Sequence, residues 1–188
     1  GKKYYVKTFG CQMNVHDSEK IAGMFELDGM IKANSEENAD VLFINTCTIR
    51  ENADDKLYGT LGQLKQWKSR QTDRKLLVGG CAAQKDKTLV RDRAPWVDVV
   101  LGTHNLTNII NLLNQSEDWG PLTEVVDEIE QMPTDAPSIR ESESSAWLTI
   151  QIGCNNSCTF CIVPSVRGPE ISRRPGDIIN EAKQLVDN

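Results

Sequence analysis

Three cysteines on one short stretch are the residues of this sequence best suited to chemistry. Cys154, Cys158 and Cys161, the loop cysteines, have the spacing C-x3-C-x2-C directly after the largely apolar run 147–152. Three thiolates can hold three irons of a cubane cluster, whereas a tetrahedral zinc or an ordinary four-iron cluster takes four protein ligands. A missing fourth ligand leaves one metal position open to a small molecule, which is typical of a reactive metal site.

The other three cysteines, the rim cysteines, each follow a short run of strand-forming residues. Cys11 follows the run 4–9 and a glycine, Cys47 follows 41–46, and Cys81 follows 76–80. The second and third runs are nearly continuous in apolar residues, as expected of strands buried on both faces of a parallel sheet. A helical pattern follows each of the three runs, so strands and helices alternate.

This alternation predicts an α/β fold with a doubly wound, mostly parallel sheet over residues 1–115. The remaining predicted elements are helices near 18–29, 51–68, 89–90 and 109–113, a strand at 97–102 and a short strand at 30–33. Ligands of such sheets bind beyond the carboxyl ends of the strands, where all three rim cysteines fall. One cysteine there would mean little, because free cysteine is a common core residue. Three at the ends of three strands favour a second metal site.

Disulfide bonds and a structural zinc are the competing explanations for six cysteines. The start Gly1-Lys2-Lys3 has no apolar segment like that of a signal peptide. At 188 residues and 39% hydrophobic composition, the chain does not need covalent staples to hold a core. No stretch is long enough to span a bilayer. We therefore expect a cytoplasmic protein, not a membrane protein, with reduced, metal-binding cysteines.

The segments around the cysteines resemble a known family. Thr8-Phe9-Gly10-Cys11-Gln12-Met13-Asn14, Asn45-Thr46-Cys47 and Gly79-Gly80-Cys81 look like the amino-terminal domain of the methylthiotransferases. The run 153–164 looks like the start of their radical S-adenosylmethionine (SAM) domain, with Phe160 as the aromatic residue before the last cysteine. The tripeptide Gln-Met-Asn after Cys11 resembles the one found at this position in the branch of the family that acts on isopentenyladenosine in tRNA. One departure is Ser165-Val166, where many relatives carry Tyr-Thr.

The resemblance implies a set of cofactors and partners. It implies two four-iron, four-sulfur (4Fe-4S) clusters, one on Cys154, Cys158 and Cys161 and an auxiliary one on Cys11, Cys47 and Cys81. The open iron of the first cluster would bind SAM, with Phe160 at the cofactor site. Reductive cleavage of SAM would yield a radical that removes hydrogen from carbon 2 of isopentenyladenosine at tRNA position 37, where a methylated sulfur is inserted. The partners implied are tRNA and an electron donor such as a flavodoxin or ferredoxin.

Charge and length suggest how the chain is organised. Residues 116–145 hold nine acidic residues against one basic residue, a net charge of −8 in a chain of −6, which leaves +2 for the rest. This composition, with three prolines, predicts an acidic linker. Residues 146–188 would then begin a radical SAM partial (β/α) barrel, and we expect the chain to be a fragment. Arg167, Arg173 and Arg174 form a basic group that could contact phosphates or be a solvated turn.

Two alternative functions remain open at this point. The first is another methylthiotransferase branch, acting on threonylcarbamoyladenosine or on a ribosomal protein, which assays of each substrate would separate. The second, from a different class, is a non-catalytic iron–sulfur protein for electron transfer or cluster delivery. That protein would not bind SAM, whereas the radical SAM hypothesis requires SAM on the open iron. His16 and His104 are not predicted as site residues, because a lone histidine in such a loop is more often a surface or capping residue.

Overall fold

A six-stranded parallel sheet forms the centre of the protein. The computed structural model describes residues 1–48, 52–127, 129, 138–140, 142 and 144–187. The strand order is β2-β1-β3-β4-β5-β6, and every neighbouring pair is parallel. The strands are β1 (Lys3–Phe9), β2 (Ile31–Lys32), β3 (Val41–Thr46), β4 (Lys75–Gly80), β5 (Val99–Leu101) and β6 (Leu122–Glu124).

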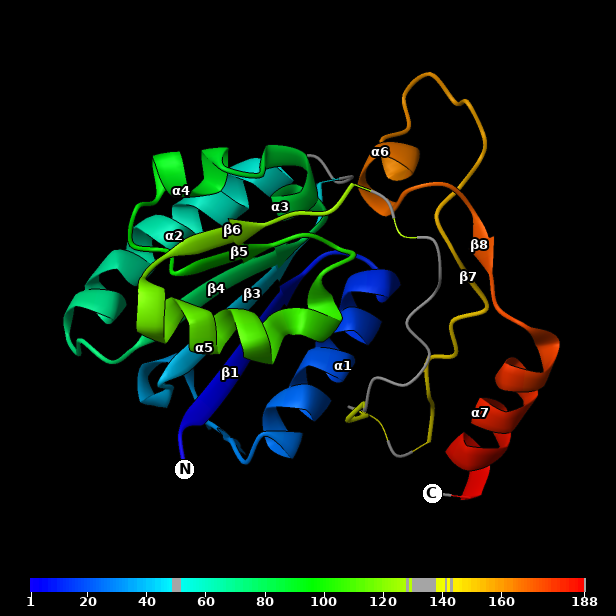
Figure 1. Ribbon diagram of the computed structural model, residues 1–188, viewed down its shortest axis with the longest axis horizontal. Coiled ribbons are helices and arrows are strands. Elements are labelled where there is room, and N and C mark those ends of the chain that lie inside the picture. Colours follow the sequence, from blue (N-terminus) through cyan, green and yellow to red (C-terminus); the bar gives the residue numbers. More distant parts are fainter. Residues whose placement is uncertain (49–51, 128, 130–137, 141, 143, 188) are drawn as a thin grey trace.

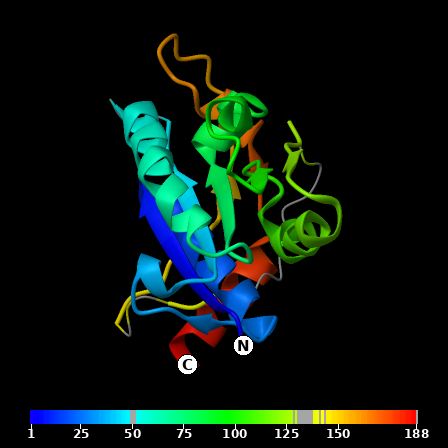
Figure 2. The same cartoon turned by 90° about the vertical axis from the view of Figure 1, so that its left-hand side faces the viewer.

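Helices cover both faces of this sheet, so the α/β prediction with a doubly wound sheet is confirmed. Helices α1 (Gln12–Leu27) and α5 (Ile109–Trp119) pack on one face, and α2 (Ala53–Ser69), α3 (Cys81–Asp86) and α4 (Leu89–Arg93) pack on the other. Short 3-10 turns lie at Glu36–Asn38 and Leu106–Asn108. The two helical layers remain on opposite sides of the sheet in the rotated view of Figure 2.

The burial pattern explains why these segments take these forms. All six residues of β3 are buried, because β1 and β4 flank it and helices cover both of its faces. In α2 the buried positions Leu57, Leu61, Leu64 and Trp67 recur at helical spacing and place one apolar stripe on the sheet. The apolar runs that predicted these two elements are therefore the core of the protein.

Part of the predicted acidic linker belongs to the α/β layer. Residues 116–119 complete α5, and residues 122–124 form β6, which pairs with β5 at the edge of the sheet. A three-residue edge strand is too short to show a period in the sequence. The acidic composition around it favoured the prediction of a linker. Residues 128, 130–137, 141 and 143 of the same predicted linker lie outside the described residues.

The predicted start of a (β/α) barrel over 146–188 does not take that form in the described residues. Strand β7 is only Gln151–Ile152, and it pairs antiparallel with β8 (Ile171–Ser172). Helix α6 (Val163–Arg167) lies between them, and helix α7 (Pro175–Asp187) follows with no buried residue. A single β/α unit cannot bury both of its faces, and this segment instead forms a two-stranded ribbon beside the α/β layer (Figure 1).

Specific hydrogen bonds attach the carboxy-terminal segment to the α/β layer. The Thr103 hydroxyl donates to the carbonyl of Val166 at 2.7 Å. The Thr149 hydroxyl lies 2.7 Å from Nδ1 of His16, whose side chain is buried on α1. These bonds hold both β7 and α6 close to the carboxyl end of the sheet. Among the described residues, none of the helices combines the length and apolar character needed to cross a membrane.

Replacing Gly80 by alanine should destabilise the fold. Gly80 has a positive φ of +91°, and a Cβ there would lie 2.4 Å from Oδ1 of Asn45 and 2.5 Å from the carbonyl oxygen of Thr46. Backbone strain and overpacking together should cost about 2–4 kcal/mol in the free energy of unfolding, measured by urea denaturation. Gly62, in α2, is the control, since its Cβ would meet open space. Gly62→Ala should stabilise by about 0.5–1 kcal/mol, and equal losses in both variants would contradict the assignment.

The protein should lose stability as the pH decreases, because His16 has a lowered pKa in the folded state. Burial, assisted by the charge of Lys20, lowers the pKa of His16 to about 4, against about 6.5 in an unfolded chain. As the pH falls below 6.5, His16 becomes protonated in the unfolded chain, whereas in the folded protein it stays neutral until about pH 4. The free energy of unfolding therefore decreases between pH 6.5 and pH 4. Glutamine can still pair with Thr149 but does not titrate. We expect the free energy of unfolding of His16→Gln to decrease by about 3 kcal/mol less than that of the parent between pH 7 and pH 4. A wild-type-minus-variant difference that does not change between pH 7 and 4 would disprove the lowered pKa.

Candidate functional site

The rim cysteines lie together at the carboxyl edge of the sheet. Cys11 precedes α1 after β1, Cys47 follows β3, and Cys81 is the first residue of α3 after β4. Strands β1, β3 and β4 are consecutive in the sheet, and their register aligns Phe9 with Thr46 and Thr46 with Gly80. Because the chain passes from β1 to β2 on one side and returns to β3 on the other, Cys11 and Cys47 border the topological switch point, where ligands of such sheets bind.

Gly10 allows the ends of β1 and β3 to approach each other closely. Its φ is +152°, and a Cβ at this position would lie 2.3 Å from Oδ1 of Asn14 and 2.9 Å from Cβ of Cys47. A side chain at residue 10 would therefore push the turn that carries Cys11 away from Cys47.

Two buried asparagines fix the positions of Cys11 and Cys47, and the sequence analysis did not identify them as site residues. Asn14 accepts from the Cys11 amide at 3.2 Å and donates to Oδ1 of Asn45 at 3.0 Å. Asn45 donates to the Asn14 carbonyl at 2.8 Å and to the Ser18 hydroxyl at 3.0 Å. A signal was present, because Asn45 interrupts an otherwise apolar strand and a buried amide requires partners.

Arg167 connects the carboxy-terminal segment to the rim. Its Nε donates to the sulfur of Cys81 at 3.3 Å, and its Nη1 donates to Oδ2 of Asp17 at 2.7 Å. The side chain is only 7% exposed, so the predicted solvated turn is wrong for Arg167, while the phosphate contact stays a prediction. The side chain of Arg173 is also 7% exposed and donates to the Thr149 carbonyl and to Glu181, whereas Arg174 is exposed. The predicted basic group therefore does not form a single cationic surface.

At both Cys81 and Arg167, burial and neighbouring charges shift the pKa in opposite directions. Burial raises the pKa of the Cys81 thiol, and the Arg167 guanidinium partly reverses this. Burial alone would lower the pKa of Arg167, but the Asp17 carboxylate and the Cys81 sulfur together outweigh it and raise the pKa above its ordinary value. Arg167 is therefore a fixed cation beside a sulfur that must lose its proton before it can bind a metal.

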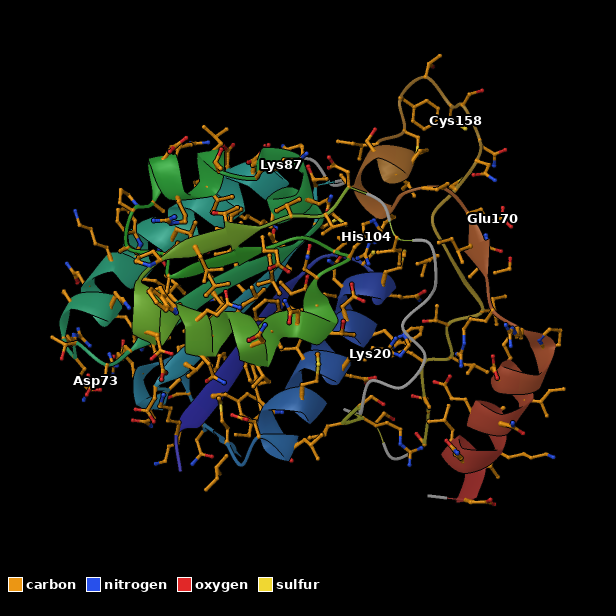
Figure 3. The ribbon with its side chains drawn as sticks, in the orientation of Figure 1. Lys20, Asp73, Lys87, His104, Cys158 and Glu170 are labelled. Carbon is orange, nitrogen blue, oxygen red and sulfur yellow. The ribbon has the colours of Figure 1, made fainter. Side chains whose placement is uncertain are left out.

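The loop cysteines lie in a different environment. Cys154 and Cys161 are half-buried, Cys158 is exposed, and Phe160 is 92% exposed. Hydrogen bonds close the base of the loop: the Cys154 amide donates to the Gly168 carbonyl at 3.1 Å, and the Cys161 amide donates to the Cys158 carbonyl at 3.1 Å. Figure 3 shows Cys158 on the part of the chain that projects from the body. The loop can thus present its sulfurs to a metal without disturbing a core.

The donor sets fit iron–sulfur clusters better than disulfides or a single metal ion. None of the six cysteines forms a disulfide bond. Within the described part of the chain, no three His, Cys, Asp or Glu side chains converge on a point that one ion could occupy. A zinc ion needs its ligands within about 2.3 Å of one centre. A cubane cluster presents a separate iron to each cysteine, so it suits thiols that share an edge or a loop without meeting at one point.

A cavity of about 300 Å³ lies next to the rim, between α1, the loop after β5 and residues 147–152. Its titratable lining residues come from three segments: His16, Asp17, Lys20, His104 and Arg167. Burial lowers the pKa of both Lys20 and His104. Both residues lie on the side of the α/β layer that faces the carboxy-terminal segment (Figure 3).

Relatives of known name match nearly the whole length of this chain in sequence. One from Corynebacterium jeikeium is 52% identical over 188 residues, which is 100% of this chain and 37% of the relative. One from Tropheryma whipplei is 54% identical over 184 residues, covering 97% of the chain and 39% of the relative. Both are named tRNA-2-methylthio-N(6)-dimethylallyladenosine synthase. The chain thus spans less than two fifths of the length of these relatives, whose names confirm the resemblance drawn from the cysteine segments.

A family model agrees with this similarity. The model described as "Uncharacterized protein family UPF0004" matches residues 3–102, which is more than half of the chain and includes all three rim cysteines. The chain therefore belongs to this family.

Proposed function

We propose that this chain serves in a tRNA methylthiotransferase that adds a methylthio group to carbon 2 of isopentenyladenosine at position 37. The observation that carries the proposal is the placement of the cysteines: three at one edge of the sheet, and three on an exposed loop whose base is bonded to that edge. The names of the relatives support the choice of nucleoside. We further propose tRNA and an electron donor such as a flavodoxin or ferredoxin as partners, and a cytoplasmic location.

Each set of cysteines would hold one 4Fe-4S cluster. The rim cysteines would bind the auxiliary cluster, and the loop cysteines would bind the cluster to which SAM attaches, with Phe160 near the cofactor. When bound, these cofactors supply the one-electron and radical chemistry that an unactivated adenine C–H bond requires, which no side chain can supply. The division into an auxiliary-cluster domain, an acidic connector and the start of a radical SAM domain belongs to the same proposal.

The residues of the chain would divide the remaining work. Asn14 and Asn45 hold the turns of Cys11 and Cys47 in register. The exposure of the loop at Cys158 and Phe160 leaves room for a small molecule to reach an open metal position. Arg167 keeps the base of that loop against the strand ends. The rim cysteines would thus be held rigidly, while the loop cysteines stay accessible to a small molecule. A reaction that uses two metal sites needs both sites to be positioned relative to the reactants.

The two sets of cysteines should contribute equally to the iron content. After anaerobic reconstitution, the chain with Cys154, Cys158 and Cys161 all replaced by alanine should keep about half of the iron and sulfide of the parent, because each set holds its own cluster. The chain with the rim cysteines replaced should keep the other half. Iron and sulfide are quantified chemically. Loss of all iron, or of none, in either variant would disprove two independent sites.

Cys47→Ala should separate the two halves of the reaction. We expect the variant to cleave SAM at close to the parent rate but to make no methylthiolated nucleoside, because the loop cysteines are untouched while the auxiliary site has lost a buried ligand. The assay measures 5′-deoxyadenosine and modified nucleoside together, in a protein that has the full length of the relatives.

Cys158→Ala is the control for this experiment and should abolish both products. Methylthiolation by the Cys47 variant at the parent rate would make the rim cysteines structural. Parent activity only on tRNA carrying threonylcarbamoyladenosine would instead assign the neighbouring branch.

A further inference from the structure

We infer that Arg167 is a positioning residue that raises the reduction potential of the cluster on the rim cysteines, through its hydrogen bond to the sulfur of Cys81. The inference rests on the proposed function, because it requires a cluster at the rim. It goes beyond that function by assigning an electrostatic role to a residue that lies outside the segment matched by the family model.

The contact is specific in its geometry. The Nε–H of Arg167 points to the Cys81 sulfur at 3.3 Å, across 86 residues of sequence. Asp17, on α1, accepts from Nη1 at 2.7 Å and orients the planar guanidinium. Three elements thus meet at one thiol: α6 brings the donor, α3 brings the sulfur and α1 brings the carboxylate.

The surroundings make this charge effective. Arg167 is 6% exposed and Cys81 is fully buried, so water screens the interaction little. The Nη2 atom of Arg167 is also buried and has no hydrogen-bond partner within the described residues. Within the described residues, the guanidinium therefore has no hydrogen-bond acceptor besides Asp17 and the Cys81 sulfur.

The direction of the effect follows from charge. Reduction adds one electron to a cluster and so one negative charge, while hydrogen bonds to the ligand sulfurs and the net charge nearby set the potential. A cation that donates an N–H to a ligand sulfur stabilises the reduced form more than the oxidised form. Arg167 should therefore raise the potential, and Asp17 should lower it.

Arg173 provides a matched control. Its side chain is also 7% exposed, it is also paired with a carboxylate, and it lies in the same segment. Its hydrogen-bond partners within the described residues are Glu181 and the Thr149 carbonyl, not a cysteine. If Arg167 only docked the carboxy-terminal segment, replacing either arginine would have the same kind of effect on stability and none on the potential.

The experiment measures the potential of the rim cluster alone. The chain carries alanine at Cys154, Cys158 and Cys161, and the cluster is titrated with dithionite, which supplies the single electron, while electron paramagnetic resonance follows the reduced form. We expect Arg167→Met to disfavour reduction about tenfold, or roughly 59 mV for one electron. Asp17→Asn, which keeps the arginine, should shift the potential in the opposite direction. Arg167→Lys, which keeps the charge, should fall between Met and the parent, and Arg173→Met should not change the potential.

The outcomes separate the inference from the proposed function. If no cluster assembles while Arg167 is intact, the rim is not a cluster site and both fail. If the cluster assembles but Arg167→Met leaves its potential unchanged, the inference fails and the proposed function stands. If Arg167→Met itself prevents assembly, Asp17→Asn decides, and an unchanged potential in that variant overturns the inference.

Discussion

The amide pair of Asn14 and Asn45 is the interaction on which the geometry of the rim depends. Both side chains are fully buried, and a buried amide without partners costs about 1–3 kcal/mol. They meet this cost by bonding to each other, to Ser18 and to the backbone at Cys11. Since Asn14 belongs to α1 and Asn45 to β3, the network fixes the start of the helix against the end of the strand. Because Cys11 directly precedes α1 and Cys47 directly follows β3, the same network also positions these two cysteines.

The two sets of cysteines differ in rigidity and access, and the difference matches different tasks. The rim cysteines follow the ends of consecutive strands, and Cys47 and Cys81 are buried, so a metal bound there would have little freedom and little contact with solvent. The loop cysteines sit on a segment closed at its base, with Cys158 exposed. A buried site suits a cofactor whose potential the protein tunes. An accessible site suits a cofactor that must take a small molecule into an open position.

Local signals in the sequence were sufficient for most of the α/β layer. Strands β3 and β4 are buried on both faces, and continuous apolar runs mark such strands, so the positions of Cys47 and Cys81 followed directly. Strand β6 was missed because an edge strand of three residues has no period. Arg167 was misjudged for a different reason. Its contact with Cys81 spans 86 residues, and nothing local distinguishes a buried arginine from a solvated one.

The fate of the arginines also bears on how tRNA would be recognised. Attraction to a phosphate backbone needs clustered, accessible cations. Here the side chains of Arg167 and Arg173 are both only 7% exposed and are paired with Asp17 and Glu181 within the protein, and the chain as a whole carries a net charge of −6. The basic residues nearest the loop cysteines are therefore used to hold the carboxy-terminal segment in place and to offset charge at a cysteine. In the proposed function, these two arginines would therefore serve the metal-binding architecture.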